Sequence, residues 1–484
     1  MKILLLNPPL YDLSKYRKGL LLSAAPALSL GYLAAVVKKA GYDVKIIDML
    51  FYDWEKVEEV LHKEKPDIVG ITCLTEGRMS AFRLAALVKK VNKKTIVVMG
   101  GHHATYMYDQ VLSNFQVDFI VLGEGEITFL NLIKTLNKKN NPNSVHGIAY
   151  KKGTKIVKTK DRAPIVNLDS LPFPLYEQFD FDAYPKVSTL NPQLIKMNSW
   201  NQLKDRKYAS IITSRGCPYN CQFCSSTVFW GVKWRFRSAQ NVLDEIELLY
   251  KKYNIRYFNF ADDAFTVDTK RAIEICKGIL DRKLDIVWDC TTRANFITEE
   301  LVIWMKKAGC IMTALGVESG SAKILKNINK KVTIEQVINA FKILHKVGLP
   351  AYPLLMVGNP GETEETVEET KKLINIIKPF NVAVSITMVF PGSALYNLAK
   401  QQKFINDDFW LSDKPQPYYT LEWPIEKLEE WRDKLTYSIL SSNNEKIKWS
   451  LSRIGRNIKY SFIAPVFTIP IFQKFINSFR IFLK

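Results

Sequence analysis

Several features that would assign this chain to a familiar class are missing. There is no G-x-G-x-x-G and no Walker A motif, which excludes the usual dinucleotide and nucleoside-triphosphate sites. No uninterrupted apolar run reaches the ~18 residues of a membrane-spanning helix, and the first residues contain neither a signal-peptide core nor a cleavage site. The seven cysteines are odd in number and suit a reducing compartment better than a disulfide framework. We therefore expect a cytoplasmic protein.

The size and composition are those of an ordinary globular protein. The 484 residues predict about two to four domains, and 47% hydrophobic and 24% charged residues are normal values. The net charge of +20 is compatible with a lysine-rich surface, an acidic substrate or an anionic membrane. We expect no specific nucleic-acid partner.

The C-terminal tail has no acidic residue. From Lys446 to Lys484 there are eight Lys or Arg side chains among many aromatic residues, and no Asp or Glu. Pro465 and Pro470 divide its apolar stretch into pieces too short to cross a bilayer. Such a segment suits peripheral contact with a membrane surface. Packing of the tail on its own domain is the alternative.

The N-terminal third alternates strand-like and helix-like segments. Apolar runs at 3–6, 44–47, 67–72, 95–99 and 119–122 are separated by segments of helical periodicity. This pattern predicts a doubly wound sheet of five parallel strands, and such sheets bind ligands beyond the carboxyl ends of their strands. The candidate ligand contacts there are Pro8, Thr72, Thr75, Gly100, Gly101, His102, Gly123 and Glu124.

Three cysteines lie within eight residues, at Cys217, Cys221 and Cys224. Three thiolates can hold three corners of an iron–sulfur cluster, whereas four ligate a fully coordinated one. The fourth iron would then be open to a small molecule. The alternatives are a zinc knuckle or a chance cluster of thiols, but zinc usually takes four ligands in paired C-x2-C groups, and no second pair follows.

A second β/α series runs from about 208 to 399. Six strand-like segments, beginning at 211–213 and ending at 382–389, predict a partial barrel, and active sites of β/α barrels lie at the carboxyl ends of the strands. Six polar or glycine residues follow four of these strands: Asp262, Asp263, Arg293, Glu318, Ser319 and Gly358.

The C-x3-C-x2-C spacing, with Phe223 before the last cysteine, resembles the radical S-adenosylmethionine (SAM) superfamily, as does Gly-Val-Glu-Ser-Gly-Ser at 316–321. The resemblance implies a [4Fe-4S] cluster on the three cysteines and SAM at the open iron. It also implies that Phe223 lies against the adenine, that the Glu318 and Ser319 segment contacts the ribose and methionine, and that Arg293 pairs with the SAM carboxylate. Asp262, Asp263 and Gly358 are expected in the same set of SAM contacts.

A five-strand domain before such a core resembles the cobalamin-binding domain of the cobalamin-dependent radical SAM subfamily. The opening Leu-Leu-Leu-Asn-Pro-Pro, the Gly-Gly-His-His-Ala-Thr stretch and Gly-Glu-Gly-Glu lie at matching places. The resemblance implies cobalamin as a cofactor, held by the eight strand-end residues named above. The D-x-H-x-x-G motif is absent, so no histidine ligand of that type is expected. A flavodoxin-like domain without its cofactor is the alternative.

The expected organisation is a cobalamin-binding Rossmann-like domain at 1–140, a linker at 141–207, a radical SAM core at 208–399 and a small helical C-terminal region at 400–484. The resemblance implies an enzyme that cleaves SAM reductively and methylates an unactivated carbon of a small molecule or lipid-like substrate. A flavodoxin or ferredoxin-type protein would supply the electron. Ring formation or rearrangement without methyl transfer is the alternative, and a non-catalytic cobalamin or cluster redox sensor is the third hypothesis.

Overall fold

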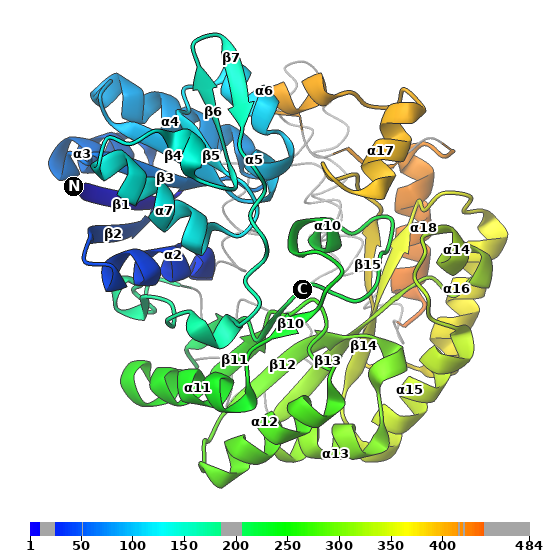
Figure 1. The fold of residues 1–484 in the computed structure, drawn as a ribbon. Helices are drawn as coiled ribbons and strands as arrows, with labels where there is room; N and C mark the ends of the chain where they lie inside the picture. The colour runs from blue at the N-terminus through cyan, green and yellow to red at the C-terminus, as the bar shows by residue number, and fades with distance from the viewer. Residues whose placement is uncertain (10–24, 51, 185–205, 415–416, 420–421, 440–484) are drawn as a thin grey trace, which may run out of the picture. The chain divides into compact units, whose positions relative to one another are not determined.

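The computed structural model describes residues 1–9, 25–50, 52–184, 206–414, 417–419 and 422–439. Residues Met1–Ile439 form one compact unit built around two large sheets (Figure 1). The basic aromatic tail, on which the prediction of membrane contact depends, lies outside the described residues. No helix in the part that the structure describes is both long and apolar enough to cross a bilayer.

The first sheet contains the five predicted parallel strands in the order β2-β1-β3-β4-β5. The strand order reverses between β1 and β3, although the strands themselves stay parallel, and doubly wound sheets bind ligands at such a point. An antiparallel hairpin that the sequence analysis did not predict extends the sheet beyond β5. The strands are β1 (Lys2–Asn7), β2 (Asp43–Asp48), β3 (Ile68–Thr72), β4 (Ile96–Gly100), β5 (Phe119–Val121), β6 (Ile148–Lys152) and β7 (Lys155–Lys158).

Helices cover both faces of this sheet because its central strands are apolar on both sides. Ile3 and Leu5 pack against the face covered by α2 and α7, whereas Leu4 and Leu6 pack against α3, α4 and α6. Asp53 caps α3 by accepting a hydrogen bond from the Lys56 backbone amide. The helices are α2 (Leu28–Lys39), α3 (Trp54–Glu64), α4 (Arg78–Val91), α5 (His102–Tyr106), α6 (Tyr108–Asn114) and α7 (Gly125–Asn137).

The second sheet is a curled half-barrel of six parallel strands in the order β15-β14-β13-β12-β11-β8, as predicted. Its helices lie along the outer face of the sheet (Figure 1). The strands are β8 (Tyr208–Ile211), β11 (Tyr257–Phe260), β12 (Val287–Thr292), β13 (Cys310–Glu318), β14 (Ala351–Val357) and β15 (Ala383–Ile386). The helices are α11 (Ala239–Tyr253), α12 (Thr269–Asp281), α13 (Glu299–Lys307), α14 (Ala322–Asn327), α15 (Ile334–Val347) and α16 (Glu364–Ile377).

The chain after the half-barrel is helical as far as it is described, with α17 (Ala394–Gln401) and α18 (Ile425–Tyr437). The segment after α17 packs against the first sheet's helices through Arg78, which is buried beside Trp410. The Arg78 guanidinium donates to the backbone carbonyls of Thr75, Trp410, Ser412 and Lys414. These contacts attach the C-terminal segment to the first sheet.

Gly309 offers a test of this packing, because it joins α13 to β13 with φ of +88° and a Cβ there would lie 2.3 Å from the Ile286 carbonyl oxygen. Gly153, in the β6–β7 turn, also has a positive φ of +63°, but no atom lies within 4 Å of a Cβ. Gly153→Ala should lower the free energy of unfolding by about 1–2 kcal/mol, and Gly309→Ala by about 2–5 kcal/mol because the clash adds to the same backbone cost. Denaturant unfolding midpoints measure both. Equal losses would contradict the described packing.

Candidate active site

The three cysteines lie in a closed loop at the carboxyl end of β8. The short strands β9 (Ser214–Arg215) and β10 (Arg235–Phe236) pair antiparallel, with Arg215 opposite Arg235. Gly216 opens the loop with φ of +85°, and a Cβ there would meet the Gly231 carbonyl oxygen at 2.8 Å. The sequence between the two strands contains all three cysteines and the short helix α10 (Ser226–Trp230). The cysteine loop, defined here as residues 216–234, is therefore clamped at both ends.

Asp262 holds the chain where it enters this loop. Its buried carboxylate accepts hydrogen bonds from the backbone amides of Thr213 at 2.7 Å and Ser214 at 2.9 Å, and from the Thr213 hydroxyl. The strand predicted at 211–213 is observed as β8, Tyr208–Ile211. It ends before Thr213 because the amides of Thr213 and Ser214 bond to Asp262. Burial raises the pKa of Asp262 from its ordinary value. Asp263 accepts a hydrogen bond from the Ser226 hydroxyl at 2.6 Å, so it contacts the loop itself, whereas Asp262 holds the two residues that lead into it.

Cys217 and Cys221 are buried and Cys224 is half-buried. Burial raises the pKa of the Cys217 and Cys224 thiols, so their thiolates need a nearby positive charge. The positive charge of Arg293 opposes the rise in the pKa of Cys217, and Arg293 Nη1 lies 3.8 Å from Cys221 Sγ. The Arg293 guanidinium also stacks on Tyr219 and donates to the Lys330 and Lys331 carbonyls. Arg293 thus lies beside Cys221 and donates to backbone carbonyls, whereas the resemblance predicts that it pairs with the SAM carboxylate.

The cysteine loop fits a cluster by the chemistry of its donors. Three neighbouring thiols, two of them buried and one of these beside a guanidinium, are suited to iron, whose positive charge favours the thiolate. Among the described residues, no group of three His, Cys, Asp or Glu side chains converges on a single ion. A cluster does not require such a group, because each of the three thiolates binds a different iron atom.

Three other residues predicted to contact SAM lie at the carboxyl ends of strands, as expected. Glu318 is the last residue of β13, Ser319 follows it, and Gly358 follows β14. Glu318, with φ of +69°, forms a buried ion pair with Lys330 at 2.6 Å. The Ser319 hydroxyl lies 3.3 Å from that of Thr370, and the Gly358 amide donates to Glu362 at 2.6 Å. Phe223 is half-buried and packs against the core that includes Trp410.

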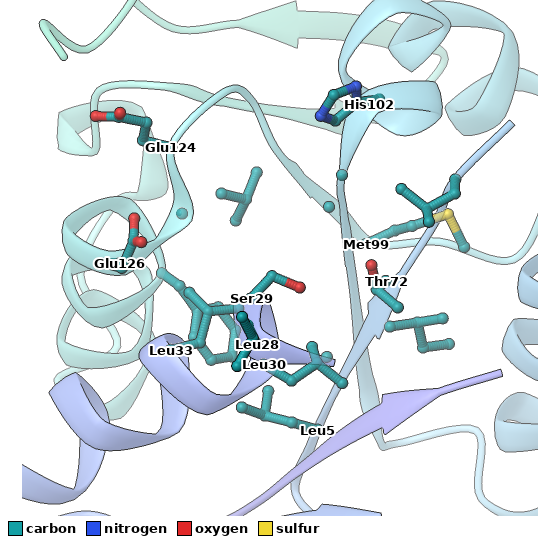
Figure 2. A pocket seen from close by; sticks show the side chains of 18 of the residues that line it. Leu5, Leu28, Ser29, Leu30, Leu33, Thr72, Met99, His102, Glu124 and Glu126 are labelled. Atoms are coloured by element: carbon teal, nitrogen blue, oxygen red, sulfur yellow. The ribbon is translucent and has the colours of Figure 1, made fainter. Parts of the chain in front are cut away.

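A cavity of about 370 Å³ lies beyond the carboxyl ends of β1, β3, β4 and β5 (Figure 2). Its floor is apolar, with Leu5 and Phe129 beside Gly70, where a Cβ would lie 2.6 Å from the Leu5 side chain. Two other walls come from the second half of the molecule, through β8 and the helix α10. The polar or partly polar lining residues are Ser29, Thr72, His102, Glu124, Glu126, Ser210 and Trp230.

Six of the eight residues predicted to contact cobalamin line this cavity: Thr72, Gly100, Gly101, His102, Gly123 and Glu124. Pro8 and Thr75 are not among the lining residues, and Thr75 is buried with its carbonyl bonded to Arg78. Four further lining residues were not predicted from the sequence, namely Ser29, Glu126, Phe229 and Trp230. Of these, Glu126 could have been predicted from the sequence, because it is the last residue of the Gly-Glu-Gly-Glu stretch that follows β5.

The two neighbouring histidines of α5 point to different surroundings. His102 lines the cavity and stacks on Phe229 of α10, with ring centroids 3.9 Å apart. Burial lowers the pKa of His102 to about 4, so this imidazole is neutral near pH 7. His103 is fully buried between Phe82 and Trp410, away from the lining residues.

The cavity fits part of a cobalamin molecule. Because Gly70 has no side chain, Leu5 and Phe129 can pack beside it to form an apolar floor that suits a flat apolar ring, and the polar rim suits amide and hydroxyl groups. The volume falls within the range of small-molecule sites.

Comparison with known proteins gives two family matches. The model of the radical SAM superfamily matches residues 211–374, and the model of the B12 binding domain matches residues 21–133. These ranges contain the cysteine loop and most of the cavity.

Two curated relatives are similar over most of this chain. An uncharacterized methyltransferase, PH0819, of Pyrococcus horikoshii is 34% identical, and the alignment covers 91% of each chain. The anaerobic magnesium-protoporphyrin IX monomethyl ester cyclase of Rubrivivax gelatinosus is also 34% identical, over 77% of this chain and 66% of the relative.

Among solved structures, the radical SAM methyltransferase TsrM of Kitasatospora setae, with tryptophan and a SAM analogue bound, superposes with a TM-score of 0.67. The alignment covers 91% of this chain and 83% of that chain at 18% identity, so it shows a shared fold.

Removing the Asp262 carboxylate should disorganise the cysteine loop. Asp262→Ala leaves three buried donors without an acceptor, at a cost of about 1–3 kcal/mol in the free energy of unfolding. We expect the iron bound after anaerobic reconstitution to fall by about half or more, because the loop would no longer be held. Asp285→Ala, at an exposed position before β12, is the matched control. Wild-type iron content in Asp262→Ala would contradict this role.

Glu362 should make stability depend on pH. Burial raises the pKa of Glu362 from 4.5 to about 7. The native state therefore retains this proton up to a higher pH than the unfolded chain, and stability falls as pH rises from about 4.5 to about 7. Glu362→Gln should remove this dependence and be more stable than wild type above pH 7 by up to about 3 kcal/mol. Unfolding midpoints across this range measure it, with the exposed Glu365→Gln as control. Parallel wild-type and Glu362→Gln curves would refute the assignment.

Proposed function

Because the chain belongs to the cobalamin-dependent radical SAM enzymes, we propose that it methylates an unactivated carbon of an apolar small molecule or lipid-like substrate. The observation that carries this proposal is the composition of the cavity wall. Phe229 and Trp230 follow Cys224 by only a few residues, yet they line the same cavity as the strand ends of the first sheet. The regions for the two metal cofactors therefore adjoin one another.

The enzyme uses a [4Fe-4S] cluster, SAM and cobalamin. Cys217, Cys221 and Cys224 would hold the cluster, and the strand ends around the cavity would hold cobalamin. Together these cofactors supply a carbon-centred radical and a transferable methyl group, chemistry that protein side chains do not provide. In the proposed assignment, Phe223, Asp262, Asp263, Arg293, Glu318, Ser319 and Gly358 form or support the SAM side of the site.

The chain's own residues would position the cofactors and keep water out. Asp262 fixes the entry of the cysteine loop, and Arg293 compensates the charge of Cys221. The neutral His102, stacked on Phe229, covers part of the cavity without adding a charge. A dry site protects a radical from side reactions, which is the contribution expected of these contacts.

Exposed apolar residues near the cavity support an apolar substrate. Leu74, which lines the cavity, is 51% exposed, and Val228 of α10 is 43% exposed. Val232, just beyond α10, is 54% exposed. Apolar side chains left in water at the edge of a pocket commonly mark a surface that binds an apolar partner. Leu74 lines the cavity, and Val228 and Val232 are close in sequence to the lining residues Phe229 and Trp230, which favours an apolar substrate there.

Ring formation without methyl transfer is the second candidate, because the cyclase relative is as identical to this chain as PH0819. The share of each relative that aligns with this chain favours methylation. The chain and the methyltransferase PH0819 cover 91% of one another, whereas the matched part is 66% of the cyclase.

Two partners belong to the same proposal. A flavodoxin or ferredoxin-type protein would deliver the electron, and the net charge of +20 would attract an acidic protein of this kind. The basic aromatic tail would contact the inner face of the membrane from the cytoplasm, near a lipid-like substrate.

The products of SAM distinguish the two candidate reactions without knowledge of the substrate. Anaerobic protein loaded with cluster and cobalamin, given SAM and a reductant, should form S-adenosylhomocysteine as well as 5′-deoxyadenosine. The first product reports loss of the methyl group and the second reports radical cleavage. Cys217→Ala should lose 5′-deoxyadenosine formation, and Cys276→Ala, a buried thiol outside the loop, should keep both products. Formation of 5′-deoxyadenosine without S-adenosylhomocysteine would favour ring formation instead.

A further inference from the structure

A buried set of charges joins the cavity to the cysteine loop. Arg215 Nη2 lies 2.5 Å from Glu126 Oε1, and Arg215 Nη1 lies 3.4 Å from Glu124 Oε1. Arg235 Nη1 is 2.6 Å from the same Glu124 oxygen. All four side chains are at most 8% exposed. The acids lie at the start of α7, which packs on the first sheet, and the arginines belong to β9 and β10.

The position of the two arginines gives these ion pairs a mechanical consequence. Arg215 and Arg235 face one another across the β9–β10 pair, which closes the cysteine loop. Arg215 lies two residues before Cys217, and its guanidinium also lies 5.0 Å from the Trp230 ring. A displacement of either glutamate would therefore be transmitted to both ends of the loop.

Glu126 also has a free acceptor. It lines the cavity (Figure 2), and the residue is 6% exposed. Its second carboxylate oxygen, Oε2, is buried and has no hydrogen-bond partner among the described residues. A buried carboxylate oxygen without a donor is costly, and native structures usually satisfy such atoms with a ligand, water or ion. Because Glu126 lines the cavity, an N–H or O–H group of a ligand bound there is the candidate donor.

We propose that Glu126 is a positioning residue that couples the two cofactor sites: Oε2 accepts a hydrogen bond from an amide or hydroxyl of cobalamin, while Oε1 holds Arg215 and the cysteine loop. This inference rests on the assignment of the cavity to cobalamin. Coupling between two sites is reciprocal, so the cluster strengthens cobalamin binding by the same factor as cobalamin strengthens cluster binding.

Titration with hydroxocobalamin tests the coupling without any turnover. The dissociation constant is measured by absorbance for chelator-treated, iron-free protein and for the reconstituted protein. In the wild type we expect tighter binding with the cluster, by about fivefold or more. Glu126→Gln should weaken binding to the reconstituted protein by about tenfold, because a charge-assisted bond is lost. It should also reduce the difference between the two forms to less than about twofold.

The control is Glu64→Gln, which removes another buried carboxylate, at the end of α3, where it pairs with Lys2 and Lys45 away from the cavity. It should keep both the affinity and the difference. If Glu126→Gln does not fold, Arg215→Lys keeps the positive charge but has a single donor group, and it should lose the difference in the same way.

The inference would be overturned if Glu126→Gln bound hydroxocobalamin with wild-type affinity, or if its affinity changed with the cluster as much as that of the wild type. It would also be overturned if the wild-type affinity were the same with and without the cluster. A wild type that binds no hydroxocobalamin in either form would overturn the cofactor assignment as well. The two failures are therefore distinguishable.

Discussion

The contact between two glutamates and two arginines is the interaction on which the arrangement of this molecule depends. Burying four charges costs desolvation energy that their attraction only partly returns, so such a set contributes little net stability. Each ion pair is favourable only when its two side chains lie close together. The set therefore fixes how the strand ends of the first sheet meet the cysteine loop, through Glu124, Glu126, Arg215 and Arg235. The cavity walls from α10 follow from that placement.

Much of the fold could be predicted because its determinants are local. Continuous apolar runs separated by helical periodicity predicted the five parallel strands and the six-stranded half-barrel, both of which are present. Buried parallel strands need apolar residues on both faces, so their signal lies in a few consecutive residues. The antiparallel β6–β7 hairpin was not predicted, since its second strand, Lys-Ile-Val-Lys, is short, partly exposed and rich in lysine.

The candidate site was only partly predictable. Residues at strand ends share one edge of a sheet, and this placed Thr72, Gly100 and Glu124 at the cavity. Whether a side chain at that edge points to a ligand or to the protein depends on distant partners. Glu126 and Arg215 are 89 residues apart, and their pairing has no local signature. For the same reason the sequence could not show that Thr72 lines the cavity whereas Thr75 does not. The carbonyl of Thr75 accepts a hydrogen bond from Arg78.

The central claim is that one chain holds a cluster on three cysteines and a cobalamin in the adjoining cavity. The most direct test is anaerobic purification and reconstitution, followed by counts of iron and cobalt per chain and an assay for 5′-deoxyadenosine formed from SAM. The account predicts about four irons, about one cobalt and SAM cleavage, with iron and cleavage lost when Cys217, Cys221 and Cys224 are replaced by alanine. Iron and SAM cleavage without cobalt would contradict it, since the cavity would then hold something other than cobalamin.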